Sequence, residues 1–173
     1  MKKSVGLIVM SKIPKAGKEV LVAVLQRRGR FNTEKMAPES YPSCCQVTSH
    51  GKLFETEKLF EGLFREAREE LGQPFSGLVK ANVSRGIQML THVADKEKEV
   101  TTFGVLVPTV WLKAIQWGPD SGGADLIAQE NLDDIVEIAD EMKVTGPEFI
   151  HTLAMFPDEI EAVRKAFEIF GKK

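Results

Sequence analysis

The sequence has few of the features that mark secreted, membrane-bound or nucleic-acid-binding proteins. Its 173 residues contain two cysteines, and because Cys44 and Cys45 are adjacent, an ordinary disulfide bridge between them is disfavoured. This pattern favours a reducing, cytoplasmic location. The 23 basic and 25 acidic residues leave a formal net charge of −2, too small to attract nucleic acid or an anionic membrane. We therefore expect a small-molecule ligand, with neither nucleic acid nor membrane as a partner.

Long apolar runs and internal repeats are also lacking. The apolar part of residues 1–10 ends before Lys12, which is too early for a signal peptide. No other stretch approaches the roughly 20 apolar residues needed to cross a bilayer. With 43% hydrophobic residues, a chain of this length can bury one core. We expect residues 1–173 to form a single domain.

Short runs of β-branched and aliphatic residues indicate strands, and helical spacing indicates helices. Strands are predicted at residues 5–10, 20–26, 44–48, 83–90, 100–107 and 135–138. Helices are predicted at residues 57–71, which Gly72 and Pro74 should end, and at residues 157–170. Residues 27–42 and 118–123 are predicted as loops, and residues 111–117 as a strand or short helix. These elements predict an α/β arrangement, with a mixed sheet between helices.

The helix predicted at residues 57–71 has an acidic face beside its apolar one. Its apolar residues recur every three or four positions: Leu59, Phe60, Leu63, Phe64, Ala67 and Leu71. Glu66, Glu69 and Glu70 fall together beside this stripe. Like charges at such spacings repel by about 0.2–0.5 kcal/mol per pair, so a bound cation would offset the repulsion. Oxygen ligands suit Mg²⁺ or Mn²⁺, although a solvated face partly neutralised by Arg65 and Arg68 is the alternative.

The residues around this helix resemble the Nudix box. Gly51 is followed by Glu57 and then by the run Arg65–Gly72, so every fixed position of that pattern is present. Gln73 stands where an aliphatic residue usually follows, which leaves the charged set intact. The resemblance implies a Nudix-type α/β/α sandwich and a hydrolase that uses Mg²⁺ or Mn²⁺ to cleave a phosphoric anhydride.

The resemblance also implies roles for the acidic residues. Glu69 and Glu70 would be the principal metal ligands, and Glu66 a further ligand or the residue that deprotonates the attacking water. Arg65 and Glu57 would orient these carboxylates.

Two further metal ligands follow from the same resemblance. Gly51 would offer its backbone carbonyl to the cation. A later loop would add a carboxylate, for which we choose Glu130 over Glu97, Glu99, Asp120 and Asp125. A solvated surface acid is the alternative for each of these five.

Substrate contacts are predicted on either side of residues 44–48. Arg27, Arg28 and Arg30 follow a predicted strand closely enough to reach a phosphate or stack on a base, with a solvated loop as the alternative. His50 adjoins Gly51 and would line the pocket.

The leading hypothesis for function is hydrolysis of a nucleoside diphosphate linked to another moiety. A non-catalytic nucleotide-binding sensor is the second hypothesis. The third is an isomerase of the isopentenyl diphosphate type, which would need Cys44 or Cys45, although a buried core residue is the simpler interpretation of either.

Subgroup markers within the family give little guidance on the substrate. The tyrosine that some dinucleoside polyphosphate hydrolases carry after the box has no counterpart, since the sole tyrosine is Tyr41. No proline lies between Pro74 and Pro108, which weakens an ADP-ribose assignment. Oxidised nucleoside triphosphates and nucleotide sugars stay open, as does a homodimer formed through residues 111–117.

Overall fold

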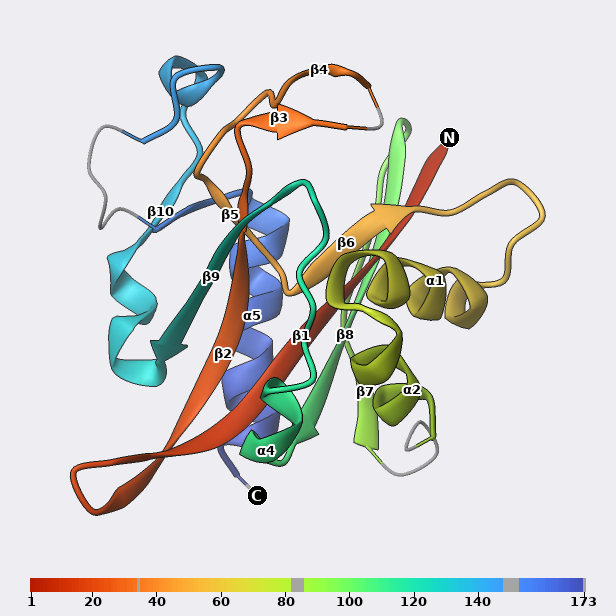
Figure 1. Ribbon diagram of the computed structural model, residues 1–173. Helices are drawn as coiled ribbons and strands as arrows, with labels where there is room; N and C mark the ends of the chain where they lie inside the picture. The colour runs from red at the N-terminus through yellow and green to blue at the C-terminus, as the bar shows by residue number, and fades with distance from the viewer. Residues whose placement is uncertain (34, 82–85, 148–152, 173) are drawn as a thin grey trace.

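A mixed sheet with β1 near its centre organises the molecule (Figure 1). The computed structural model describes residues 1–33, 35–81, 86–147 and 153–172. The strand order is β5-β2-β1-β8-β7, with β6 also pairing with β1 and β9 with β2. The strands are β1 (Lys2–Lys15), β2 (Lys18–Arg28), β5 (Cys45–Gln46), β6 (Ser49–Lys52), β7 (Ile87–Ala94), β8 (Lys98–Val107) and β9 (Ser121–Ala128). The pair β1–β8 is parallel and the other pairs are antiparallel.

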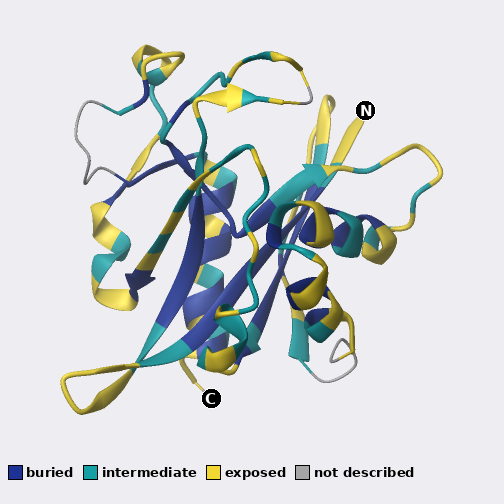
Figure 2. Ribbon diagram, in the orientation of Figure 1, coloured by how far each residue is buried: buried dark blue, intermediate teal, exposed yellow. Residues whose placement is uncertain are grey.

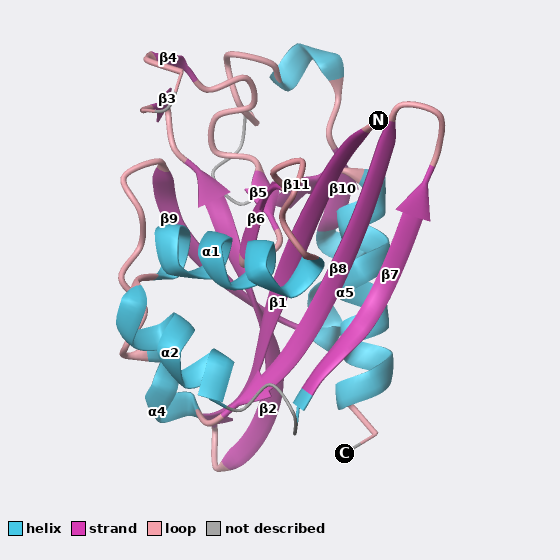
Figure 3. Cartoon of the chain, turned by 90° about the vertical axis from the view of Figure 1, so that its right-hand side faces the viewer, coloured by secondary structure: helices cyan, strands magenta, loops and turns pink. Residues whose placement is uncertain are grey.

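Helices cover both faces of this sheet (Figure 3). Side chains of β1 alternate, so that Val5 and Leu7 pack under α1 (Leu59–Leu71) and α2 (Gln73–Ala81), whereas Ile8 and Met10 pack against α5 (Pro157–Phe170). The short helix α4 (Thr109–Leu112) follows β8. Buried residues therefore follow the sheet and the inner faces of α1 and α5 (Figure 2). This is the mixed α/β arrangement predicted from the sequence.

Smaller elements surround this framework. Strands β3 (Phe31–Asn32) and β4 (Ala37–Pro38) form an antiparallel pair, and β10 (Ile135–Glu137) and β11 (Leu153–Met155) form a parallel one. Two 3₁₀ helices occupy Gln129–Asp134 and Asp140–Met142. Within the described ranges, no helix is long and apolar enough to cross a membrane.

Several sequence-based boundaries need correction. Gly72 ends α1, but Pro74 does not end the helical region, because α2 begins at Gln73 and proline is tolerated in a first helical turn. Residues 121–123, predicted as loop, open β9 despite their glycines. The strand predicted at residues 83–90 begins at Ile87 in β7, and residues 82–85 lie outside the described part. Residues 111–117 contribute only to α4.

A separation between β1 and β2 creates room beside α1. The two strands pair from Val9 and Val24 outward to their hairpin, and beyond that point they diverge. Residues 45–52 fill the separation, first pairing with β2 through β5 and then with β1 through β6. Thr48 joins the two sides, since its hydroxyl accepts from Val9 N at 2.8 Å and donates to the Val24 carbonyl. The strand β6 is thereby fixed against α1.

Candidate active site

Arg65 of α1, whose side chain is 15% exposed, is the centre of an ion-pair network. Its Nε and Nη2 donate to the two carboxylate oxygens of Glu57 at 2.8 and 2.9 Å. Its Nη1 donates to Glu66 at 2.7 Å and to Glu69 at 3.1 Å. Its Nη2 also donates to the Lys52 carbonyl at 2.7 Å. The guanidinium therefore holds three carboxylates relative to β6.

The pKa values around Arg65 follow from these contacts. The Arg65 hydrogen bonds hold the pKa of Glu57 below its usual value, and hydrogen bonding to Glu57 raises the pKa of Arg65. An aromatic ring adds to this, because the Arg65 guanidinium carbon lies 4.2 Å from the Phe54 ring centroid. Both charges of the Arg65–Glu57 pair are thus strongly retained.

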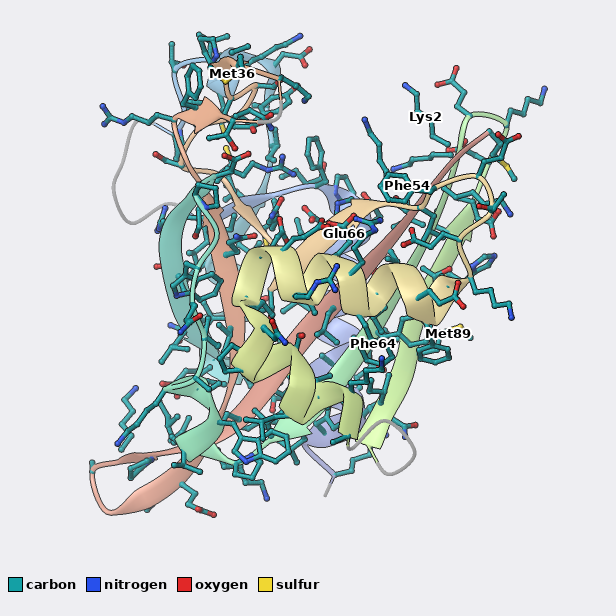
Figure 4. The ribbon with its side chains drawn as sticks, turned by 45° about the vertical axis from the view of Figure 1, so that its right-hand side comes forward. Lys2, Met36, Phe54, Phe64, Glu66 and Met89 are labelled. Carbon is teal, nitrogen blue, oxygen red and sulfur yellow. The ribbon has the colours of Figure 1, made fainter. Side chains whose placement is uncertain are left out.

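Glu66 is buried between α1 and β6 (Figure 4). A Cβ added to Gly51 would lie 1.9 to 2.1 Å from the Glu66 carboxyl atoms, so only glycine leaves room for this side chain. Burial raises the pKa of Glu66, and the Arg65 hydrogen bond opposes that rise. Position 51 therefore requires glycine for a steric reason, because the Glu66 carboxylate packs directly against the Gly51 Cα.

Glu70 occupies a different environment one turn further along α1. Its carboxylate accepts from the His50 backbone N–H at 2.8 Å and from Gln46 Nε2 at 3.5 Å. Burial raises its pKa to about 8, against the effect of the His50 hydrogen bond. The C-terminal end of α1 also contacts the segment before β9, since Gly118 N donates to the Glu70 carbonyl at 2.9 Å. Glu70 is thus a half-buried acid that lacks a direct cationic partner among its described contacts.

The carboxylates suit a hard divalent cation in their chemistry. Glu66, Glu69 and Glu70 share one face of α1, and the Glu66 carboxylate occupies the room beside Gly51. Glu69 is 51% exposed and bends toward Arg65, so no three His, Cys, Asp or Glu side chains of the described chain converge as a metal cluster. The donor set fits Mg²⁺ or Mn²⁺, with Glu69 on the solvent side.

A cavity lies at the end of β2. It has a volume of about 350 Å³ and is lined by Arg27, Arg28, Gly29, Arg30, Phe31, Thr33, Ser43, Pro119, Ser121 and Gly122. The arginines predicted to contact substrate therefore surround one space.

The sequence and the fold were compared with those of known proteins. No family model and no curated protein matches the sequence. Among solved structures, a mutT/nudix family protein from Listeria innocua superposes with a TM-score of 0.64 at 18% identity, over 99% of this chain and 94% of that chain. The chain has the Nudix fold.

Other solved structures with this fold differ in what they bind. An Ap4A hydrolase from C. elegans matches at 12% identity and a TM-score of 0.57, over 100% of both chains. The Nudix domain of NrtR from Shewanella oneidensis, crystallised with ADP ribose, matches at 14% identity and a TM-score of 0.57, over 97% of this chain and 87% of that chain. At these identities the likeness establishes the fold alone.

Within this Nudix fold, the backbone carbonyl that faces the carboxylates belongs to His50. In an antiparallel strand the N–H and C=O of one residue point to the same side, and those of its neighbours to the other side. The His50 N–H points to Glu70, away from β1, so its carbonyl does too, whereas the Gly51 carbonyl points toward β1. The prediction that Gly51 supplies a carbonyl to the cation is corrected accordingly.

The His50 ring does not line the space beside Glu66. Because side chains alternate along β6, the ring lies on the α5 face, where its Cδ2 would be 3.5 Å from a Cβ on Gly6. Burial, together with the nearby charge of Arg28, lowers the pKa of His50 to about 4, so the imidazole is neutral at pH 7. His50 acts on the carboxylates through its backbone.

Glu130 is far from the box. It lies in the 3₁₀ helix Gln129–Asp134, is 68% exposed and pairs with Lys15 at 3.3 Å. Lys15 is eight residues along β1 from Leu7, the partner of Ser49, a separation of roughly 25 Å. Glu130 is therefore wrong as the additional ligand.

The four other acids considered for this role are also placed outside the carboxylate face. Glu99 pairs with Lys3 and Asp125 with Arg27, at 2.9 and 2.7 Å respectively. Asp120 accepts from Thr33 N at 2.9 Å. Glu97 lies in the turn between β7 and β8.

One residue that the sequence did not single out, Gln46, contacts a carboxylate of the site, and another, Glu159, is a buried acid of α5. Gln46 donates to Glu70 and to Gln26, linking the carboxylate to β2. Glu159, in the first turn of α5, is 5% exposed, and burial raises its pKa to about 7. Its Oε2 and Arg28 Nε are buried without a hydrogen-bond partner among the described atoms. A spacing pattern carries no signal for such contacts, because they join residues 20 or more positions apart.

The cysteines are buried core residues. Cys44 and Cys45 are both 0% exposed. Burial raises the pKa of Cys45 to about 12, and burial raises that of Cys44 as well. Thiols of this kind are poor nucleophiles, which counts against an isomerase that depends on them.

Proposed function

We propose that the protein hydrolyses the diphosphate of a nucleoside diphosphate linked to another moiety, with the help of Mg²⁺ or Mn²⁺. The observation that carries this proposal is the Glu66 carboxylate, packed against the bare Gly51 and fixed by Arg65 beside two further glutamates. The cytoplasm as location and a small nucleotide as ligand belong to the same proposal.

The cation would be held by the carboxylates of Glu66, Glu69 and Glu70 together with the His50 carbonyl. When bound, it would neutralise the diphosphate oxygens, whose negative charge repels an attacking water. Glu66 completes the site either as a ligand or as the base that takes the proton of that water; its raised pKa suits the second role.

The protein itself supplies orientation. Arg65 holds Glu57, Glu66 and Glu69 in one arrangement, so these carboxylates need little reordering when a cation arrives. His50 N–H and Gln46 hold Glu70 by neutral contacts. The burial of Glu70 raises its pKa, and a nearby cation would favour its charged form.

Turnover of a substrate panel tests this proposal. Nucleoside triphosphates, dinucleoside polyphosphates, nucleotide sugars and ADP-ribose are incubated with Mg²⁺ or with EDTA, and phosphate or monophosphate release is measured. We expect cation-dependent release, reduced at least about 100-fold by Glu66→Gln, Glu69→Gln or Glu70→Gln and unchanged by the exposed, distant Glu130→Gln. Release that persists in all three box variants would reject the site.

A nucleotide-binding module without turnover is the second candidate. It is supported by the NrtR Nudix domain, which has the same fold and was crystallised with ADP ribose. Tight nucleotide binding in calorimetry, with no product under any metal condition, would favour this candidate over hydrolysis.

A further inference from the structure

The cavity at the end of β2 shares no lining residue with the carboxylate face, but its lining residue Pro119 follows Gly118, which contacts Glu70. One wall is the segment from Arg27 to Thr33, and the other is the loop from Pro119 to Gly122. A backbone hydrogen bond joins the walls, with Gly29 N donating to the Asp120 carbonyl at 2.8 Å. Its volume of about 350 Å³ is at the lower end of the range of about 300–1,000 Å³ for small-molecule sites.

The lining of this cavity is cationic. Three of its ten lining residues are arginines, and none of the ten is acidic. Arg27 is committed to neighbours, since its Nη1 donates to the Ser43 carbonyl at 2.9 Å and its Nε lies 2.7 Å from Asp125. Arg28 and Arg30 therefore determine the positive charge that is available to a ligand in the cavity.

Arg28 and Arg30 retain unused donors. Arg28 Nη1 is 3.7 Å from Glu39, a loose ion pair, and its Nε has no partner among the described atoms. Arg30 is exposed and forms no ion pair within the described chain. Guanidinium groups with free donors recognise phosphate oxygens especially well.

The position of the cavity identifies which part of a substrate would enter it. The Arg28 N–H donates to the Cys44 carbonyl at 2.9 Å, and Gln46, two residues further along the chain, donates to Glu70 at 3.5 Å. The loop that forms the second wall is tied to α1, because Gly118 N donates to the Glu70 carbonyl. A diphosphate bound at the carboxylates would therefore direct one of its attached groups toward the arginines.

We infer that this cavity binds a phosphate group that is additional to the scissile diphosphate. One of the two groups joined to that diphosphate carries this additional phosphate. The inference rests on the proposed function and narrows its substrate class to compounds with at least one further phosphate. Neutral sugars attached to a nucleoside diphosphate would leave the free donors of Arg28 and Arg30 unpaired. Phe31, which is 44% exposed at the rim, offers an apolar surface beside the phosphate.

Pairs of compounds that differ by one phosphate test the inference. NADPH is compared with NADH, and coenzyme A with dephospho-coenzyme A, which place the extra phosphate on a ribose. Adenosine triphosphate is compared with adenosine diphosphate, which places it in the chain. We expect the phosphate-rich member of at least one pair to have a kcat/KM at least about tenfold higher. The pair that responds identifies where the phosphate is carried.

Substitution of the unpaired arginine completes the test. Arg30→Gln should reduce the preference to less than about threefold by lowering kcat/KM more for the phosphate-rich member than for the phosphate-poor one, because only the added phosphate loses a partner. Arg164→Gln, an exposed arginine on α5 outside the cavity, is the matched control and should change neither value.

Two outcomes overturn the inference, and each is distinct from a failure of the proposed function. The first is equal kcat/KM within every pair, and the second is an equal loss for both members in Arg30→Gln. Calorimetric affinities of the same pairs are measured in parallel without metal. A protein that turns over none of the compounds contradicts hydrolysis, and affinities that are equal within every pair then contradict the cavity assignment as well.

Discussion

Glu66 and Glu70 lie one turn apart on α1, but the protein holds them in different ways. Glu66 belongs to the Arg65 network, where a guanidinium pairs with three carboxylates and a backbone carbonyl. Glu70 is half-buried, and its carboxylate accepts from neutral partners, the His50 N–H and Gln46. One carboxylate is thus oriented by a positive charge that the protein provides, whereas the other is partly desolvated without such a charge. We therefore expect a bound cation to stabilise Glu70 more than Glu66.

Among these predictions, removal of Arg65 should have the largest effect on activity and stability. Arg65→Ala leaves Glu57 and Glu66 without their ion pair, and we expect kcat/KM to fall about 100-fold and stability by about 1–3 kcal/mol. Arg68→Ala, on the exposed side of the same helix, is the control and should change kcat/KM less than about twofold. Steady-state kinetics and thermal denaturation measure both. Equal effects of the two substitutions would show that the network does not orient the site.

A methyl group at Gly51 should disturb Glu66 without removing any charge. In Gly51→Ala the new Cβ would lie within 2.1 Å of the carboxyl atoms, so the carboxylate must move, and we expect kcat/KM to fall about 10- to 100-fold. Gly77→Ala in α2 is the control, because a Cβ there meets nothing within 4 Å, and helix propensity makes it neutral or stabilising. Full activity in Gly51→Ala would contradict the steric account of this glycine.

The raised pKa of Glu70 should appear in the pH dependence of stability. Between pH 4.5, its ordinary pKa, and about pH 8, the folded metal-free protein retains a proton that the unfolded chain has released. This group therefore contributes a loss of stability as pH rises through that window, and no further loss above it. In EDTA, the difference in Tm between pH 5 and pH 8.5 should be smaller in Glu70→Gln than in the parent by about 4 °C or more.

The comparison between variants isolates this contribution. His50 acts in the opposite direction, because its pKa is lowered to about 4 and it adds stability as pH rises toward its ordinary value of 6.5. That contribution is common to the parent protein and Glu70→Gln, so it cancels in the difference. Glu130→Gln should behave as the parent does, and an identical pH dependence of all three proteins would contradict the burial of an acidic Glu70.

The smallest effect is expected at Phe54, at the exposed edge of the Arg65 network. Phe54→Ala removes the ring over the guanidinium, an interaction of about 0.5–1 kcal/mol at exposed sites, and should lower Tm by about 1–3 °C. Phe54→Leu keeps apolar area but lacks the aromatic face. A leucine variant as stable as the parent would show that the ring contributes only by covering the guanidinium.

The sequence predicted the parts of this site that depend on local spacing. The apolar stripe of α1 and the three glutamates beside it follow from helical periodicity, and α5 begins and ends where predicted. Contacts between distant segments could not be predicted in this way. The buried state of Glu159, the link from Gln46 to Glu70 and the direction of the His50 carbonyl depend on how β5 and β6 occupy the space between β1 and β2.

The two largest errors have physical reasons of the same kind. Glu130 precedes a predicted strand and looks like a loop ligand, but the pairing of β9 with β2 carries it to the hairpin end of the sheet. Pro74 looks like a helix terminator, but it falls in the first turn of α2, where its missing N–H costs no hydrogen bond. In both cases the tertiary arrangement decided the outcome.

Cation binding by the α1 carboxylates is the central claim, and a titration with Mn²⁺ followed by electron paramagnetic resonance tests it most directly. The parent protein and Glu130→Gln should bind Mn²⁺ with the same affinity, and Mg²⁺ should displace it. Glu66→Gln, Glu69→Gln and Glu70→Gln should each weaken binding by about tenfold or more. Unchanged Mn²⁺ affinity in all three box variants would contradict the account.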